Sequence, residues 1–195
     1  MQPPQPQPLQ TVSDPALAAL RALRPAPSDL ADYQVKYVAQ VQAGDVLETL
    51  RAQLDDVLAL MASLPVGRHH HRYAPGKWSI AELMGHLTDT ERVFSLRALC
   101  FARKDPGPLP GFDEDPYVEA AGFDARGLPS IMQEFEHLRR ANLALFGSFD
   151  AAAFERRGTA SGRDISVRAL VYLTAGHVAH HLQVLRERYL EHDAP

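Results

Sequence analysis

Four stretches of the chain repeat apolar residues at the three- to four-residue spacing of an amphipathic helix. The first stretch runs from Asp45 to Leu64 and ends at the helix-breaking sequence Pro65-Val66-Gly67. Its apolar positions are Val46, Leu50, Leu54, Leu58 and Met61. This pattern predicts the first long helix.

The second stretch carries the clearest start signal in the sequence. Ser79 and Glu82 have the Ser-x-x-Glu spacing of a capping box, and Trp78 and Leu83 occupy the positions of a hydrophobic staple around it. We therefore expect the second helix to begin at Ser79. It should end near Arg103, because three prolines that cannot continue a helix follow at positions 106, 108 and 110.

The third and fourth stretches follow a long segment without helical spacing. Pro129 suits the first turn of a third helix that reaches about Ser148, and a fourth helix begins near Ser166. Strand-like alternation of useful length is missing from the sequence pattern. The prediction is an all-α four-helix bundle, with a long irregular loop between its second and third helices.

The chain length fits a single core. With 195 residues, of which 46% are hydrophobic and 23% charged, there is little material for a second domain. Residues 1–28 are rich in proline and glutamine at the start and interrupted by Pro25 and Pro27, so they indicate a tail with one short helix. We assign residues 29–195 to the bundle.

Charge and cysteine content exclude several classes of protein. The 20 basic residues are interspersed among 24 acidic ones, which gives a net charge of −4 and disfavours nucleic-acid binding. The lone Cys100 permits no intrachain disulfide and favours a reducing cytoplasm. We also expect no signal peptide and no membrane partner, because no apolar run is long enough to span a bilayer.

Three histidines stand out as candidate metal ligands. His177 and His181 lie four residues apart in the fourth helix, so both imidazoles project from one side of it, toward the core-facing stripe. Such a pair can bind one cation if another element supplies a third ligand. His86, at the flank of the apolar face of the second helix, is the best candidate for that ligand.

Chance is the competing explanation. Nine histidines in 195 residues produce His-x-x-x-His pairs without any function, so the spacing alone is weak evidence. Three inward-facing imidazoles would, however, need buried hydrogen-bond partners, at a cost of roughly 1–3 kcal/mol for each one left unsatisfied. A zinc-protease interpretation fails, because Val178 stands where the His-Glu-x-x-His motif needs glutamate.

Other polar residues could assist such a site without binding the ion. His180 lies about 60° from His177 around the helix and suits a supporting or solvent-facing position. The other residues that we expect to orient ligands are Thr90, Glu91 and Thr174, and those on the substrate side are Arg97 and Asp113. For the charged residues, a solvated helix face or an interhelical ion pair is the alternative.

Two segments resemble the DinB/YfiT superfamily of metal-dependent four-helix bundles. They are Arg72-Tyr-Ala-Pro-Gly-Lys-Trp-Ser-Ile-Ala-Glu-Leu-Met-Gly-His86-Leu and Tyr172-Leu-Thr-Ala-Gly-His177-Val-Ala-His-His181. The resemblance covers roughly residues 40–190. It implies a helical bundle, frequently a homodimer, in which His86, His177 and His181 bind one divalent ion, with Zn expected before Ni or Mn.

The resemblance implies a range of activities. Some relatives are thiol S-transferases for bacillithiol or mycothiol, others are isomerases, and many have no known reaction. The first hypothesis is a metal-dependent thiol S-transferase or hydrolase with a small-molecule substrate, which could be a low-molecular-weight thiol. The alternative is a non-enzymatic, stress-associated bundle with a structural metal, whose fourth ligand would be a protein side chain. A third hypothesis is a metal-free bundle that works through its dimer face.

Overall fold

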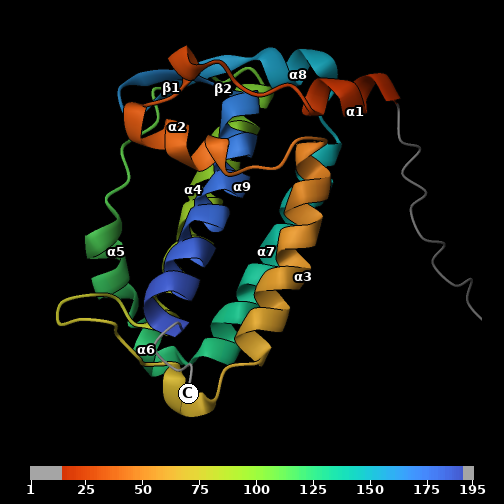
Figure 1. The fold of residues 1–195 in the computed structure, drawn as a ribbon. Coiled ribbons are helices and arrows are strands. Elements are labelled where there is room, and N and C mark those ends of the chain that lie inside the picture. Colours follow the sequence, from red (N-terminus) through yellow and green to blue (C-terminus); the bar gives the residue numbers. More distant parts are fainter. Residues whose placement is uncertain (1–14, 191–195) are drawn as a thin grey trace, which may run out of the picture.

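The four predicted long helices are present in the computed structural model, which describes residues 15–190. They are α3 (Val46–Ala62), α4 (Ile80–Ala102), α7 (Leu128–Gly147) and α9 (Val167–Val184) (Figure 1). Their bounds lie within about two residues of the sequence prediction, so the four-helix bundle is confirmed. None of the helices in residues 15–190 is long and apolar enough to cross a membrane.

The bundle has an uncommon helix order. α3 packs against α7 and α9, and α4 packs against the same two helices. Helices that follow each other along the chain, such as α3 and α4, are therefore diagonal to one another rather than neighbours. This arrangement brings α4 and α9, which carry the three candidate histidines, side by side (Figure 1).

The start of α4 is fixed by the capping box that its sequence predicts. Ser79 Oγ accepts a hydrogen bond of 3.0 Å from the Glu82 backbone N–H, and the Glu82 carboxylate accepts one of 2.8 Å from the Ser79 N–H. Each bond satisfies an N–H group that a helix start leaves without an intrahelical partner. α9 begins in a similar way, with Ser166 Oγ accepting from the Ala169 N–H at 3.1 Å.

The prediction of an irregular loop between α4 and α7 is wrong for its second half. Residues 103–113 contain no helix, but α5 (Glu114–Ala121) and α6 (Phe123–Arg126) follow them. Both helices are short, and Gly122 separates them in a left-handed conformation with φ of 60°. Helices of eight and four residues show too few turns for a periodic pattern to be recognised.

The expectation that no strand occurs is also wrong. β1 (Arg157–Ala160) and β2 (Arg163–Ser166) pair as an antiparallel hairpin between the short helix α8 (Ala151–Glu155) and α9. Its turn residues Ser161 and Gly162 both have positive φ, 52° and 71°, as a type I′ turn requires. Strands of four residues are too short for alternation to be evident.

The N-terminal part adds helices to the end of the bundle where the hairpin lies (Figure 1). α1 (Pro15–Arg21) is the one short helix expected there, and α2 (Asp32–Ala39), which was not predicted, packs on α9. The proline- and glutamine-rich start of the chain lies outside the described residues. The domain boundary at residue 28 stays a prediction.

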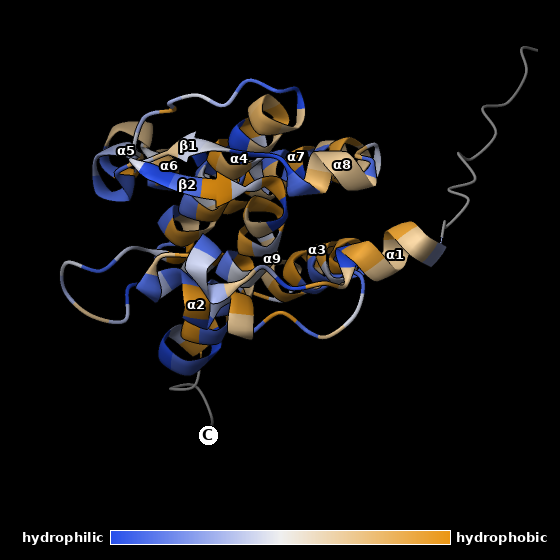
Figure 2. Cartoon of the chain, turned by 90° about the horizontal axis from the view of Figure 1, so that it is seen from above, coloured by the Kyte–Doolittle hydropathy of each residue, from blue (hydrophilic) through white to orange (hydrophobic). Residues whose placement is uncertain are grey.

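The core consists of two hydrophobic clusters along the bundle axis. One cluster includes Leu50 and Phe146, and the other includes Leu54 and Phe135. On α7, Arg139 and Asn142 lie between the two clusters and are buried, so a polar layer separates two apolar ones. Figure 2 shows hydrophobic residues along the bundle helices and hydrophilic ones in the peripheral loops.

Candidate metal centre

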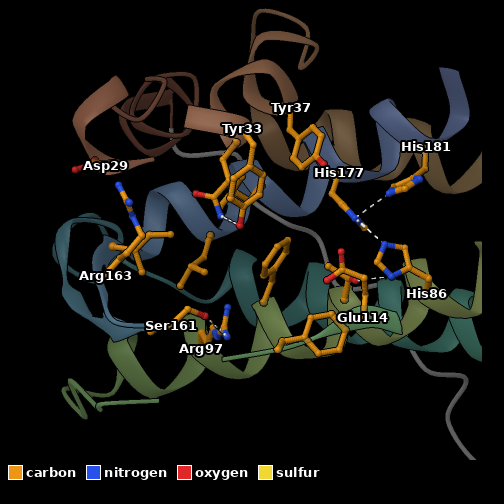
Figure 3. Close-up of a pocket in the computed structure, with 18 of the residues that line it drawn as sticks. Asp29, Tyr33, Tyr37, His86, Arg97, Glu114, Ser161, Arg163, His177 and His181 are labelled. Carbon is orange, nitrogen blue, oxygen red and sulfur yellow. Dashed lines mark hydrogen bonds between the residues drawn. The ribbon is translucent and has the colours of Figure 1, made fainter. Parts of the chain in front are cut away.

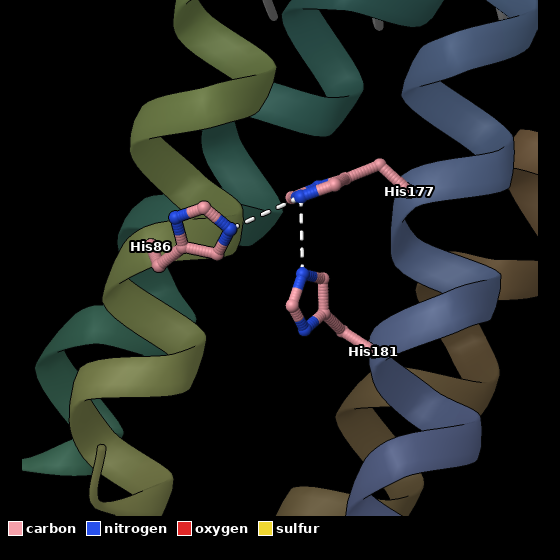
Figure 4. Close-up of side chains that lie close together, drawn as sticks. All are labelled: His86, His177 and His181. Atoms are coloured by element: carbon pink, nitrogen blue, oxygen red, sulfur yellow. Dashed lines mark hydrogen bonds between the residues drawn. The ribbon is translucent and has the colours of Figure 1, made fainter. Parts of the chain in front are cut away.

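The imidazoles of His86, His177 and His181 converge between α4 and α9 (Figure 4). Nε2 of His177 lies 3.0 Å from Nε2 of His86 and 3.1 Å from Nε2 of His181. An ion bound tetrahedrally at about 2.05 Å by three nitrogens would set these nitrogens about 3.3 Å apart. The two separations from His177 are close to that value, and one ligand nitrogen from each of the three imidazoles lies within 4.8 Å of the others.

The environment keeps all three imidazoles neutral. Burial lowers the pKa of His86 to about 4, and burial with the neighbouring His86 and His180 lowers the pKa of His181 to about 3. The pKa of His177 falls well below its ordinary value, through burial first and the other three histidines second. Neutral imidazoles keep the lone pair that a metal ion accepts, so no proton has to leave before binding at pH 7.

Hydrogen bonding alone does not satisfy this cluster. A neutral imidazole has one N–H donor, so three converging Nε2 atoms cannot all be paired by protons in a consistent way. Nδ1 of His181 is buried and has no partner in the described part of the chain. A divalent ion would accept all three lone pairs at once, which is why the donor set fits a metal better than a hydrogen-bonded cluster.

The two helices that carry the candidate ligands each have a glycine directly before the first of these histidines, Gly85 in α4 and Gly176 in α9. Close packing explains both glycines. A Cβ on Gly176 would lie 2.4 Å from the carbonyl oxygen of Tyr37, and a Cβ on Gly85 would lie 2.4 Å from the ring of Phe123. Real Cβ atoms essentially never come that close to another atom. The two glycines therefore let α2 and α6 pack tightly beside the histidines.

The four expected supporting residues behave differently. Thr90 Oγ1 lies 3.4 Å from Nδ1 of His86, where it can accept the Nδ1 proton and leave Nε2 free to bind an ion. Thr174 donates to the Leu170 carbonyl of its own helix at 3.0 Å. Glu91 faces α7, where Arg139 binds its carboxylate, so the structure does not bring it to the imidazoles.

The position of His180 is set by aromatic contacts. Its ring is half-buried, 5.1 Å from the ring of His181 and 4.7 Å from the ring of Tyr37. It does not belong to the group of nitrogens that converge. A supporting role for His180 beside the cluster stays a prediction.

A cleft of about 450 Å³ opens beside the imidazoles (Figure 3). Aromatic rings form much of its wall near the histidines: Trp78 lies 4.7 Å from the ring of His86, Tyr37 5.8 Å and Phe94 6.1 Å from that of His177. Aromatic walls with a few polar groups are typical of sites that bind small molecules.

The two expected substrate-side residues differ in position. Arg97 lines the cleft, whereas Asp113 is exposed and its neighbours Phe112 and Glu114 line the cleft instead. Sequence reasoning missed Tyr37 and Glu114, because α2 and α5 are too short to be recognised from periodicity. No Asp, Glu or Cys of residues 15–190 joins the three imidazoles as a fourth ligand.

Comparisons with known proteins agree with this geometry. The model of a family described as the DinB superfamily matches residues 49–185. A protein of Geobacillus thermodenitrificans named "Putative metal-dependent hydrolase" is 30% identical over 162 residues, which span 77% of this chain and 89% of that protein.

One solved structure shares the fold. It is YfiT from Bacillus subtilis, described as "a probable metal-dependent hydrolase with an unusual four-helix bundle topology". The TM-score is 0.62 at 16% sequence identity, with 88% of this chain and 95% of that chain covered. The diagonal placement of α3 and α4 fits that description of the topology.

Proposed function

The chain belongs to the DinB superfamily, and from this premise we propose that it is a metal-dependent hydrolase that binds one divalent ion through His86, His177 and His181. The observation that carries the proposal is the convergence of three buried, neutral imidazoles at one end of a cleft. The names of the Geobacillus and Bacillus proteins support the same reaction class.

An ion held by three neutral ligands keeps its positive charge and supplies Lewis acidity, which lowers the pKa of a water or thiol nucleophile toward neutral pH. The protein residues supply position. Thr90 orients the His86 ring, and the ring of Trp78 packs against it. Tyr37 and Phe94 flank His177 in T-shaped contacts and so narrow this end of the cleft.

Glu114 is our candidate for the proton acceptor. It lines the cleft from the first turn of α5, and Figure 3 shows its carboxylate on the histidine side. Its charge also raises the pKa of Tyr37, after burial and Tyr33, which indicates that Glu114 lies near the phenol. A carboxylate in this position can take the proton that the nucleophile loses.

The open side of the cluster supports this proposal over a structural metal. A structural site is closed by four protein ligands, whereas a catalytic site keeps a position for water or substrate. With three imidazoles and no acidic side chain among the described ligands, the catalytic arrangement fits better. Zn is the first choice and Ni or Mn the next, because imidazole suits several of these ions.

Three further expectations stay proposals. Transfer of a low-molecular-weight thiol would use the same nucleophile activation as hydrolysis, so one set of assays covers both reactions. A homodimer and a cytoplasmic location are carried by the sequence and the resemblance alone.

The deciding experiment measures metal content and metal-dependent turnover together. Purified protein should contain about one divalent ion per chain in elemental analysis, and Zn²⁺ or Ni²⁺ should raise the melting temperature of the metal-free form. Aryl esters should be hydrolysed by the loaded protein and not by the metal-free form. A parallel assay supplies a thiol and an electrophile, and faster consumption of the electrophile than of the ester would favour the transferase.

His180→Ala is the matched control for His177→Ala. Both residues lie on α9, but only His177 belongs to the converging group. His177→Ala should abolish metal-dependent turnover, whereas His180→Ala should retain bound metal. Equal metal content in the two variants would contradict the proposed ligand set.

A further inference from the structure

The cleft has a second end, away from the imidazoles, where a buried positive charge lies (Figure 3). Arg97 is 8% exposed and reaches this end from α4. Its Nη2 donates to the carbonyl of Pro110 at 2.8 Å and to Ser161 Oγ at 3.0 Å. These two bonds hold the guanidinium against the residue 103–113 segment and the hairpin turn.

The remaining donors of Arg97 lack an acceptor in the described part of the protein. Neither Nε nor Nη1 has a hydrogen-bond partner within residues 15–190, and none of the ion pairs found there includes this guanidinium. Neither nitrogen is among the enclosed, unpaired atoms, so both remain accessible. Burial lowers the pKa of Arg97, and the nearby Tyr33 raises it by a smaller amount. The guanidinium nevertheless stays protonated, as it does in proteins generally.

The other charged groups that line the cleft do not neutralise this end. Asp29 is bound to Arg157 at 2.7 Å, and Arg163, whose Nη2 donates to the Leu30 carbonyl at 3.3 Å, adds a second positive charge. Glu114 lies toward the histidines. The end of the cleft that holds Arg97 is therefore positive, and a buried charge without a counter-ion is costly.

The geometry of α4 aligns Arg97 with the candidate metal ligand. Arg97 follows His86 by eleven residues in one helix. Because a helix turns about 100° and rises about 1.5 Å per residue, the two side chains leave α4 within about 20° of each other, about 16 Å apart along its axis. Thr90 and Phe94 lie between them and also line the cleft.

We propose that Arg97 binds a carboxylate or phosphate group at one end of an extended substrate whose reacting group lies at the three histidines. This inference deepens the proposed function and rests on it for the position of the reacting group. Two observations support this proposal: Nε and Nη1 of Arg97 are accessible donors, and the guanidinium lacks a counter-ion among the described residues. The purely structural alternative is that Arg97 only fastens Pro110 and Ser161.

Binding to the metal-free protein tests the anion site by itself. Hexanoate and hexanamide have the same length and differ in charge, and isothermal titration calorimetry measures the affinity of both without a reporter group in the cleft. Charge-assisted hydrogen bonds are roughly twice as strong as neutral ones, so hexanoate should bind about tenfold more tightly than hexanamide. Hexyl phosphate in a third titration shows which oxyanion is preferred.

Variants separate anion binding from a fastening role. Arg97→Gln should abolish the preference for hexanoate while leaving hexanamide binding unchanged, and Arg97→Lys should retain part of it. Arg163→Gln is the matched control, because it removes the other positive charge at this end and should preserve most of the preference. Equal binding of hexanoate and hexanamide to the unsubstituted protein would overturn the proposal even if Arg97→Gln fails to fold.

The metal-loaded protein distinguishes this failure from failure of the proposed function. With Co²⁺ or Ni²⁺ bound, a thiolate ligand should give a sulfur-to-metal absorption band with both 6-mercaptohexanoate and 6-mercaptohexanol. No band with either thiol would count against the open metal position and leave the hexanoate result standing. Bands with both thiols, together with equal hexanoate and hexanamide binding, would reject the anion site while retaining the metal site.

Discussion

Helix α4 carries two buried polar clusters that face different neighbours and differ in how they are satisfied. Toward α7, Glu91 receives hydrogen bonds from Arg139 at 2.8 and 2.6 Å and from Asn142 at 3.1 Å. Toward α9, His86 meets two imidazoles whose nitrogens cannot all be paired. The two side chains leave α4 about 140° apart.

The Glu91 cluster is closed, in the sense that its charged groups are hydrogen-bonded to one another inside the bundle. The histidine cluster is called open because its nitrogens are not all paired. Glu91 and Arg139 are at most 2% exposed, and Arg139 also donates to the Leu50 carbonyl at 2.9 Å, while Gln53 donates to the Ala175 carbonyl at 2.8 Å. These bonds link all four bundle helices in the layer between the two apolar clusters. The histidine cluster lacks such closure and borders a cleft. A satisfied polar group indicates a structural role, and an unsatisfied one beside a cleft indicates a ligand site.

The largest expected effect comes from breaking the closed cluster. Glu91→Ala leaves Arg139 buried without its partner, so the free energy of unfolding should fall by about 3–5 kcal/mol. Urea denaturation followed by circular dichroism measures it. Glu136→Ala removes the half-buried partner of the exposed Arg140 and should cost at most about 1 kcal/mol.

A double substitution sharpens the same prediction. Replacing both charges, as in Glu91→Leu with Arg139→Met, should restore most of the lost free energy, because no unpaired charge remains. If the double variant were as unstable as Glu91→Ala, the charge pair itself would not be the reason for the loss.

Substitutions in the open histidine cluster should lower the affinity for metal rather than the free energy of unfolding. His177→Ala removes one of three ligands, and its affinity for Zn²⁺ should fall by at least about 100-fold, since even groups that only orient a ligand are worth about 10–100-fold. Competition with a chromophoric chelator measures the affinity. Thr90→Val, which removes the hydroxyl beside His86 Nδ1, should show a smaller loss. An unchanged affinity in His177→Ala would reject the ligand set.

The difference between the two clusters also explains what could be predicted from the sequence. The three histidines were singled out by local spacing on two long helices together with the family resemblance of the two segments that carry them, and the capping box fixes where α4 begins. Glu91 was expected to support them, but its partner Arg139 lies 48 residues away, and no local pattern announces that pair. Tyr37 and Glu114 were missed because only tertiary packing brings the short helices α2 and α5 to the cleft.

Packing of α2 against α9 gives a prediction of intermediate size. Gly176→Ala would place a Cβ against the Tyr37 backbone, so α2 has to move, and the free energy of unfolding should fall by about 1–3 kcal/mol. Gly147→Ala is the control, because nothing lies within 4 Å of its Cβ, and it should gain about 0.5–1 kcal/mol from helix propensity. Equal effects in the two variants would show that Gly176 is not needed for close approach.

The smallest expected effect is the pH dependence of the metal-free protein. The unfolded chain binds protons on histidine below about pH 6.5, whereas folded His86 and His181 do so only near pH 4 and 3. The unfolded state therefore holds more protons between these values, and stability is complete above pH 7 and falls as the pH decreases. From pH 6.5 to 5.5, each such histidine should contribute a loss of about 1 kcal/mol.

Replacing one of these histidines measures its contribution to the pH dependence of the unfolding free energy. His181→Gln should flatten the dependence of unfolding free energy on pH by about 1 kcal/mol over that interval, because glutamine does not titrate. Urea titrations at pH 7.5, 6.5 and 5.5 measure the slopes of the unsubstituted protein and of this variant. A slope unaffected by His181→Gln would mean that this imidazole is protonated as readily in the folded protein as in the unfolded chain, and the open cluster would then be no better donor of lone pairs than an ordinary surface histidine.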